Sequence, residues 1–129
     1  MRILFTADIF AQAGRRMASI YIPALLHERN VDFVIANGEN VAGGFGLTDN
    51  LVGKLRSYGV DVITSGNHIW DRKEFVPLLD RDDRVLRPFN YPPGAPGQGS
   101  TIAESHSGQK VAVLCLQGRT SMPNTDCPF

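Results

Sequence analysis

Five side chains with oxygen or imidazole donors stand out, because they follow three short apolar runs at residues 3–7, 33–36 and 60–65. They are Asp8, Glu39, Asn40, Asn67 and His68. Carboxylate and carboxamide oxygens are hard ligands that suit divalent ions such as Mn, Mg or Fe, and an imidazole can ligate or transfer protons. Gly-Asn before His68 is also an ordinary turn signal, but the same pattern at three successive runs favours a site.

A pair of divalent ions would make this donor set a hydrolytic centre. Two ions about 3.5–4 Å apart need a bridging ligand, terminal ligands and room for water. Glu39 or Asp8 could bridge, whereas the two asparagines would ligate without adding negative charge. His68 could protonate a leaving alkoxide. The set favours hydrolysis of a phosphate ester over redox or acyl chemistry, and no Ser-His-Asp or Cys-His arrangement competes with it on spacing.

The three runs must be neighbouring parallel strands if their polar ends are to meet. Residues 15–29 between the first two predict an amphipathic helix that carries Met17, Ile20 and Tyr21 on one face, and Pro23 predicts a kink or a late start. Asn30 closes this helix. Strand, helix, strand crossovers are nearly always right-handed, so the sequence predicts an α/β fold: a parallel sheet with helices on its faces and the site at the carboxyl ends of the strands.

The glycine-rich stretch at residues 37–46 matches neither the dinucleotide fingerprint nor the Walker pattern. It indicates instead a loop whose backbone passes close to a ligand or a neighbouring loop. Thr48 or Asp49 can cap a second helix, which places Leu51, Val52 and Leu55 inward and ends at Gly59.

The second half predicts less regular structure. We expect a short helix at residues 73–79, a solvated charged turn at 80–84, a short strand at 85–86 and a hairpin of strands 101–103 and 111–116. Residues 87–99, rich in proline and glycine, are either a connecting loop or, through Arg87 and their aromatic side chains, the lining of a substrate cleft. His27 is predicted on the surface and His106 in a turn.

Composition predicts one soluble domain over residues 1–129. Thirteen basic and thirteen acidic residues cancel, so there is no strong basic field for non-specific nucleic-acid binding. No apolar run approaches the ~20 residues of a membrane span, and Asp8 interrupts the first run too early for a signal peptide, so we expect a cytoplasmic protein. Cys115 and Cys127 are expected to be free thiols.

These motifs resemble those of the calcineurin-like metallophosphoesterases and, within them, the YmdB-type proteins. The resemblance is carried by the first run leading to Asp8, by Asn37-Gly38-Glu39-Asn40 with the glycines after it, by Gly66-Asn67-His68-Ile69-Trp70-Asp71, by Asn90-Tyr91-Pro92-Pro93-Gly94 and by Asp126-Cys127-Pro128-Phe129. The resemblance implies a dinuclear metal site, with Fe or Mn expected and Mg allowed, and hydrolysis of 2′,3′-cyclic nucleotides. By position, Asp8 and Asn40 would bind the first metal, Glu39 would bridge, Asn67 would bind the second metal and His68 would donate a proton.

Members of this family run to about twice the present length and take further histidine ligands from their second half. We therefore expect this chain to be the amino-terminal part of a metallophosphoesterase domain, with the remaining ligands supplied by a longer chain and with possible self-association. The alternative is a non-catalytic nucleotide- or protein-binding module that retains the scaffold.

Overall fold

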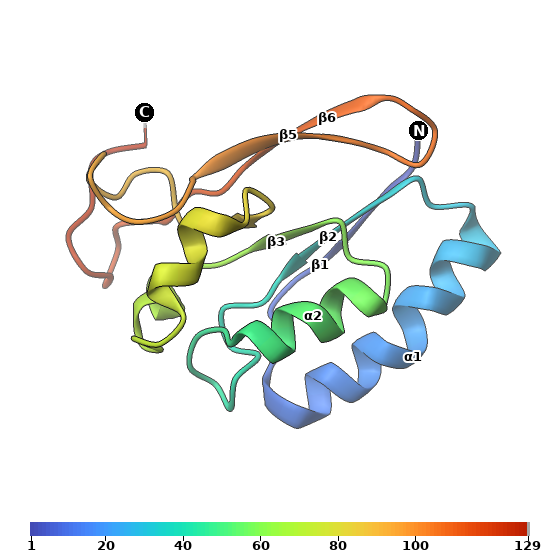
Figure 1. The fold of residues 1–129 in the computed structure, drawn as a ribbon, viewed down its shortest axis with the longest axis horizontal. Helices are drawn as coiled ribbons and strands as arrows, with labels where there is room; N and C mark the ends of the chain where they lie inside the picture. Colours follow the sequence, from blue (N-terminus) through green and yellow to red (C-terminus); the bar gives the residue numbers. More distant parts are fainter. Residues whose placement is uncertain (129) are drawn as a thin grey trace.

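The computed structural model describes residues 1–128, which form a parallel sheet covered by helices on one face and by a hairpin on the other (Figure 1). The sheet has the order β1 (Ile3–Thr6), β2 (Phe33–Asn37), β3 (Val62–Thr64) and β4 (Val85–Leu86). Its register pairs Ile3 with Phe33, Ile35 with Val62 and Ile63 with Val85. The predicted α/β class and parallel strands are confirmed, and the carboxyl ends of β1, β2 and β3 lie at one edge.

Side chains of the sheet alternate between two apolar clusters, because successive residues of a strand face opposite sides. Val34 and Ile63 pack in the cluster that contains residues of both helices. Phe33 and Val62 pack in the other cluster, against Val113 of the hairpin. The inner strands are thus buried on both faces, as expected for parallel strands, whereas Ile3 and Phe5 of β1 are exposed.

The two helices, α1 (Ala11–Arg29) and α2 (Asp49–Ser57), lie on the same face of the sheet (Figure 1). The expectation of helices on both faces is wrong. The other face is covered by the antiparallel hairpin β5 (Ser100–Glu104) and β6 (Lys110–Leu114), whose inward residues Ala103, Val111 and Val113 are buried. Thr48 caps α2 by accepting a hydrogen bond from the backbone of Leu51, as predicted.

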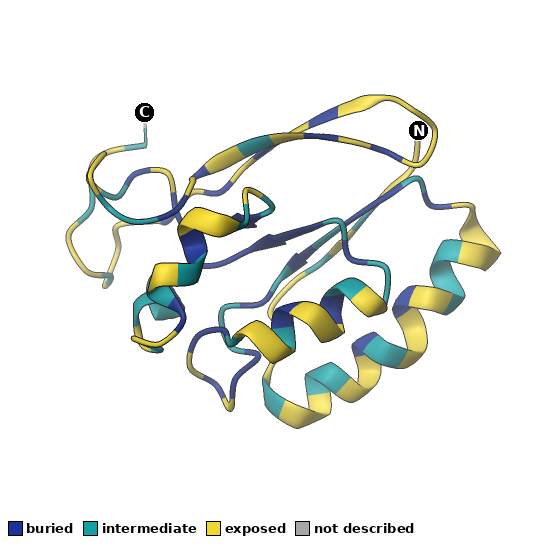
Figure 2. Cartoon of the chain, in the orientation of Figure 1, coloured by how far each residue is buried: buried dark blue, intermediate teal, exposed yellow. Residues whose placement is uncertain are grey.

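Helix α1 differs from its prediction in its start and in its buried face. It begins at Ala11, four residues before the expected position 15, and continues through Pro23 to the left-handed residue Asn30. Met17, Ile20 and Tyr21 are more than half exposed. Strand β1 is the edge strand of the sheet. Among the described residues no further strand pairs with its free side, so nothing covers this side of the helix. Figure 2 shows the resulting exposed side of α1.

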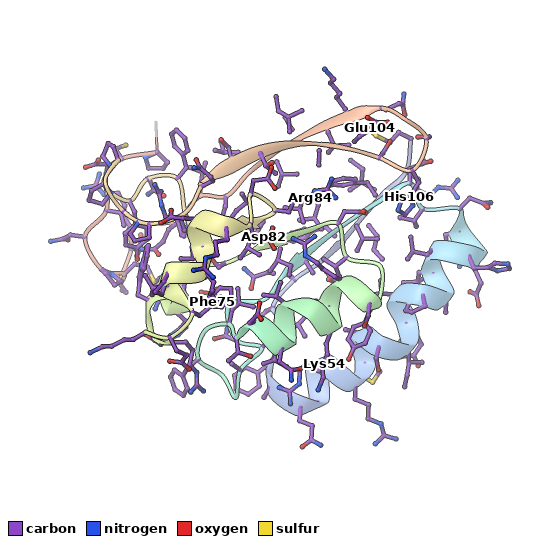
Figure 3. The ribbon with its side chains drawn as sticks, viewed as in Figure 1. Lys54, Phe75, Asp82, Arg84, Glu104 and His106 are labelled. Carbon is purple, nitrogen blue, oxygen red and sulfur yellow. The ribbon has the colours of Figure 1, made fainter. Side chains whose placement is uncertain are left out.

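The segment after β3 also differs from its prediction. The turn predicted at Asn67 and His68 is a 3₁₀-helix, η1 (Asn67–Trp70). The short helix predicted at residues 73–79 is a second 3₁₀-helix, η2 (Val76–Arg81), with a proline in its first turn. The charged turn is not simply solvated. Asp82, labelled in Figure 3, accepts hydrogen bonds at 2.7 Å from the guanidinium of Arg56 through both carboxylate oxygens. Asp80 accepts one from the backbone of Gly97.

Other expectations are confirmed. His27 is exposed near the end of α1. His106 lies in the hairpin turn, 3.6 Å from a carboxylate oxygen of Asp61 at the start of β3, which is the end of the sheet opposite the polar motifs (Figure 3). Both cysteines are free thiols. Within residues 1–128 no helix is long and apolar enough to cross a membrane.

Candidate metal and proton-transfer site

Asp8 and Asn40 meet at the carboxyl ends of the adjacent strands β1 and β2. The Asn40 side-chain amide donates a 2.7 Å hydrogen bond to a carboxylate oxygen of Asp8. The backbone reinforces this contact, because Ile9 donates to the carbonyl of Asn37 and Ala11 donates to the carbonyl of Asn40. Since the Asn40 amide nitrogen is engaged, its side-chain carbonyl oxygen is the atom left to act as a ligand.

The backbone that presents Asp8 is strained. Asp8 has φ 45° and Ala11 has φ 46°, and both values lie in the left-handed region that non-glycine residues seldom adopt. Aspartate tolerates this conformation better than alanine does, and such strain costs on the order of 1–3 kcal/mol per residue. Two strained residues flanking one turn indicate that the placement of Asp8 is maintained by the packing around it.

The carboxylate of Glu39 is partly buried and incompletely hydrogen-bonded. Its Oε2 atom is buried and has no hydrogen-bond partner. Burial raises the pKa of this carboxyl, an effect that the nearby His68 opposes through its charge and its backbone N–H. The carboxylate packs directly on Gly66, where a Cβ atom would lie 2.0 Å from Oε2. A buried carboxylate oxygen without a donor is what a bound cation would satisfy, so this residue fits a metal ligand.

Asn67 and His68 open the 3₁₀-helix η1 directly after β3. Nδ1 of His68 lies 2.6 Å from a carboxylate oxygen of Asp71, three residues ahead. The ring of Phe45 meets the imidazole edge-on, with centroids 5.3 Å apart and an interplanar angle of 85°. Asn67 is half-buried at the first position of η1. The β3 end therefore brings His68 to Glu39, while the β1 and β2 ends bring Asp8 to Asn40.

The glycine-rich loop packs against this 3₁₀-helix, as the close-approach interpretation predicted. Arg72 donates hydrogen bonds from Nε to the carbonyl of Phe45 at 3.0 Å and from Nη2 to the carbonyl of Ala42 at 2.9 Å. Gly46 has φ 74°, and a Cβ there would lie 2.8 Å from the His68 carbonyl oxygen. The absent side chain is thus what allows the loop to reach His68.

The chemistry of these donors suits a hard divalent cation. They comprise the carboxylates of Asp8 and Glu39 and two carboxamides, a set that favours Mn, Mg or Fe over thiolate-loving metals. Within residues 1–128 no three His, Cys, Asp or Glu side chains gather in a cluster that could hold an ion. The residues present therefore fit part of a metal centre. Even a single ion would need the two carboxamides as ligands in addition to the two carboxylates.

Arg87 does not reach this site. It is buried, and its guanidinium donates hydrogen bonds to the backbone carbonyls of Pro88 and Pro96, which makes it a support for the irregular loop. Arg87, Phe89 and Tyr91 nevertheless line a cavity of about 460 Å³, as the cleft alternative predicted. Tyr91 also packs edge-on against Trp70 of η1, with centroids 5.2 Å apart. Tyr91 thus links the loop to the site through Trp70, while Arg87 supports the loop backbone and lines the same cavity.

Three residues of this arrangement were missed by motif reasoning: Phe45, Asp71 and Arg72. Asp71 carries a signal in hindsight, since a spacing of three residues from His68 places both side chains on one side of a helical turn. Phe45 and Arg72 carry none, because their contacts join segments 23 to 30 residues apart in the chain. Only the folded arrangement brings them together.

The chain is similar to known proteins both in sequence and in structure. Residues 4–129 match the model of a family described as YmdB-like protein. The chain is 44% identical over 129 residues to the 2′,3′-cyclic-nucleotide 2′-phosphodiesterase of Bacillus subtilis (strain 168). Among solved structures it resembles a hypothetical protein from Thermus thermophilus, with 41% identity and a TM-score of 0.90, and a phosphatase from Mycoplasma pneumoniae, with 31% identity and a TM-score of 0.87.

These matches cover nearly all of this chain but only part of each relative. The covered share is 100% of the chain and 48% of the Bacillus protein. It is 99% of the chain and 49% of the Thermus protein, and 98% of the chain and 47% of the Mycoplasma phosphatase. The chain thus spans about half the length of the relatives it matches. The predicted α/β fold of the calcineurin-like type agrees with these structures and is confirmed.

Proposed function

Because the chain belongs to the YmdB-like protein family, we propose that it carries the amino-terminal part of a metal-dependent phosphodiesterase site that hydrolyses 2′,3′-cyclic nucleotides. The activity named for the Bacillus relative supports the substrate class. The observation that carries the metal dependence is the buried, unpaired Oε2 of Glu39 at the edge of the sheet. A buried carboxylate oxygen without a donor is costly, and a bound cation would satisfy it.

In this proposal each donor has one role. Glu39 would be shared by two divalent ions, Fe or Mn in the first instance with Mg also suitable. Asp8 and Asn40, already joined by a hydrogen bond, would hold the first ion, and Asn67 would hold the second. The bound ions would supply an acidified water and charge stabilisation at the phosphate. The neutral asparagines lower the negative charge of the site, which favours the approach of an anionic phosphodiester.

His68 transfers the proton. In hydrolysis of a 2′,3′-cyclic phosphate, cleavage of the bond to the 2′-oxygen leaves an alkoxide that must gain a proton. The half-buried position of the His68 imidazole beside Glu39 supports its donation of that proton as the P–O bond breaks. General acid catalysis of this kind contributes about 10²- to 10⁴-fold to rate.

A non-catalytic nucleotide- or protein-binding module is the second candidate. The specific observation in its favour is the ligand count. Four proposed ligands are fewer than two ions need, since hard divalent ions take about six ligands each and water alone does not retain them. In the first candidate, the remaining ligands come from the part of the relatives that this chain does not span.

The deciding experiment measures the hydrolysis of 2′,3′-cyclic AMP by the purified chain with Mn²⁺ or Fe²⁺, and identifies the product as the 3′- or the 2′-monophosphate. The assay is repeated after adding, as a separate polypeptide, the half of the Bacillus protein that lies beyond the matched region. Hydrolysis that rises on this addition and disappears in Glu39→Gln supports the proposal. Saturable binding of the cyclic nucleotide, with no hydrolysis in either mixture, supports the binding module and overturns the enzymatic role.

A further inference from the structure

The His68 imidazole contacts two side chains, those of Asp71 and Phe45. On one side, a carboxylate oxygen of Asp71 lies 2.6 Å from Nδ1. An ionised carboxylate only accepts hydrogen bonds, so Nδ1 carries the hydrogen in this contact. The hydrogen bond therefore selects the tautomer in which Nε2 is the nitrogen left for chemistry.

On the other side the ring meets Phe45. This side chain is 56% exposed, so it is not part of the apolar core, and its edge-on contact with the imidazole is its one aromatic contact within residues 1–128. The loop that carries Phe45 is tied by Arg72, whose Nε donates to the Phe45 carbonyl at 3.0 Å. Because Arg72 and Asp71 are adjacent, one short segment fixes both contacts of the ring.

We propose that Asp71 is a positioning residue for His68: together with Phe45 it fixes the imidazole in the Nδ1–H tautomer and in one orientation, which leaves Nε2 to exchange the proton with the leaving oxygen. Only the last step rests on the proposed function. In that step the ring first takes a proton from solvent at Nε2, so that both nitrogens carry hydrogen. The Nε2–H bond then breaks, the O–H bond of the alcohol forms as the P–O bond breaks, and the ring returns to the neutral form with its hydrogen on Nδ1, in the hydrogen bond to Asp71. The attacking water loses its proton to solvent.

A plain surface ion pair predicts something different. Such a pair leaves the neutral ring free to turn and to carry its hydrogen on either nitrogen. The two interpretations therefore differ in the tautomer and the mobility of the His68 ring, and both can be measured without any enzymatic activity.

The test uses the purified chain labelled with ¹⁵N-histidine, at a pH well above the ordinary imidazole pKa of about 6.5. The sequence has only three histidines, and the His68 signals are identified by their loss in His68→Gln. We expect the native chain to show the Nδ1–H tautomer alone. In Asp71→Ala this preference is lost, and in Asp71→Asn, whose amide can donate as well as accept, the two tautomers mix. Phe45→Leu keeps the tautomer but loses the ring-current shift of the His68 ring protons.

The matched control is Asp83→Asn, which removes one charge from an aspartate in the turn between η2 and β4, away from His68. It should leave the His68 signals unchanged. An Nδ1–H tautomer that persists in both Asp71 variants, or a change of the same size in Asp83→Asn, overturns the proposal. A native chain in which both tautomers are populated also overturns it.

An activity arm separates this inference from the proposed function. Where the chain hydrolyses 2′,3′-cyclic AMP, Asp71→Ala should lower kcat with KM unchanged, and the loss should shrink with a nitrophenyl ester. A loss confined to KM refutes the positioning role. Absence of hydrolysis both with and without the added half of the Bacillus protein counts against the proposed function alone, because the tautomer measurement still decides the role of Asp71.

Discussion

Replacing Glu39 by glutamine should change stability in opposite directions with and without metal. Without metal, the native carboxylate is partly desolvated, and its Oε2 has no donor. Leaving a buried polar group unpaired costs about 1–3 kcal/mol, and more when it is charged. Glutamine removes the charge but retains polar atoms in the same place, so the net gain in the free energy of unfolding should be about 1 kcal/mol. For a chain of this size that raises Tm by about 2–5 °C.

With metal the order should reverse. A ligand present at about 100 times its Kd stabilises the folded state by about 2.7 kcal/mol. The native chain gains this stabilisation through Glu39, whereas Glu39→Gln lacks the bridging carboxylate and gains much less. The variant is therefore the more stable protein in EDTA and the less stable one in Mn²⁺.

The metal-free effect should also depend on pH. The folded pKa of Glu39 is raised above its ordinary value, because burial disfavours the charged form. The folded state then binds more protons than the unfolded state between the two pKa values, so this residue lowers stability progressively as pH rises through that window. The advantage of Glu39→Gln is full above the raised pKa and vanishes below the ordinary one.

Thermal unfolding of both proteins in EDTA and in Mn²⁺, between about pH 4 and 8 to span that window, measures these differences. The control is Glu104→Gln on β5, the same loss of charge on an exposed residue at the far end of the hairpin (Figure 3). It should shift neither the metal-free Tm at neutral pH nor the gain from Mn²⁺. A lower metal-free Tm in Glu39→Gln, or an equal gain from Mn²⁺ in both proteins, would refute the account of Glu39 as a desolvated metal ligand.

Three further outcomes are expected. His68→Gln should lower hydrolysis of the cyclic nucleotide by about 10²- to 10⁴-fold, less with a nitrophenyl ester, and leave metal content unchanged; equal losses on both esters argue against a general acid. Gly66→Ala would place a Cβ 2.0 Å from the buried carboxylate oxygen of Glu39, so it should lower the free energy of unfolding by about 1–3 kcal/mol and reduce metal uptake. The control Gly94→Ala, whose Cβ would lie in open space, should change neither quantity, and thermal unfolding and elemental analysis measure both. Burial raises the pKa of Cys115 to about 11, so iodoacetamide at about pH 8 should alkylate exposed Cys127 and spare Cys115. Mass spectrometry that finds Cys115 alkylated and Cys127 intact would contradict the burial of Cys115.

The elements that carry the site could be predicted from the sequence because local patterns determine them. Apolar runs of strand length before Asp8, Glu39 and Asn67 indicated parallel strands, and the structure has β1, β2 and β3 there. Thr48 or Asp49 was identified as the cap because a side-chain oxygen just before a helix is a local signal, and the structure has Thr48 in that role. Parallel pairing then requires the carboxyl ends to share an edge, so the meeting of Asp8 with Asn40 followed from topology alone.

Burial and long-range contacts were decided only by the tertiary structure. The spacing of Met17, Ile20 and Tyr21 indicated an apolar side of α1, but which side is buried depends on whether a strand lies under it, and β1 is the edge. The placement of both helices on one face depends on the hairpin occupying the other. The contacts of Phe45 with His68 and of Arg72 with the loop depend on Gly46 lying against η1, a contact between segments more than 20 residues apart. Such contacts arise from the packing of whole elements, which no local spacing encodes.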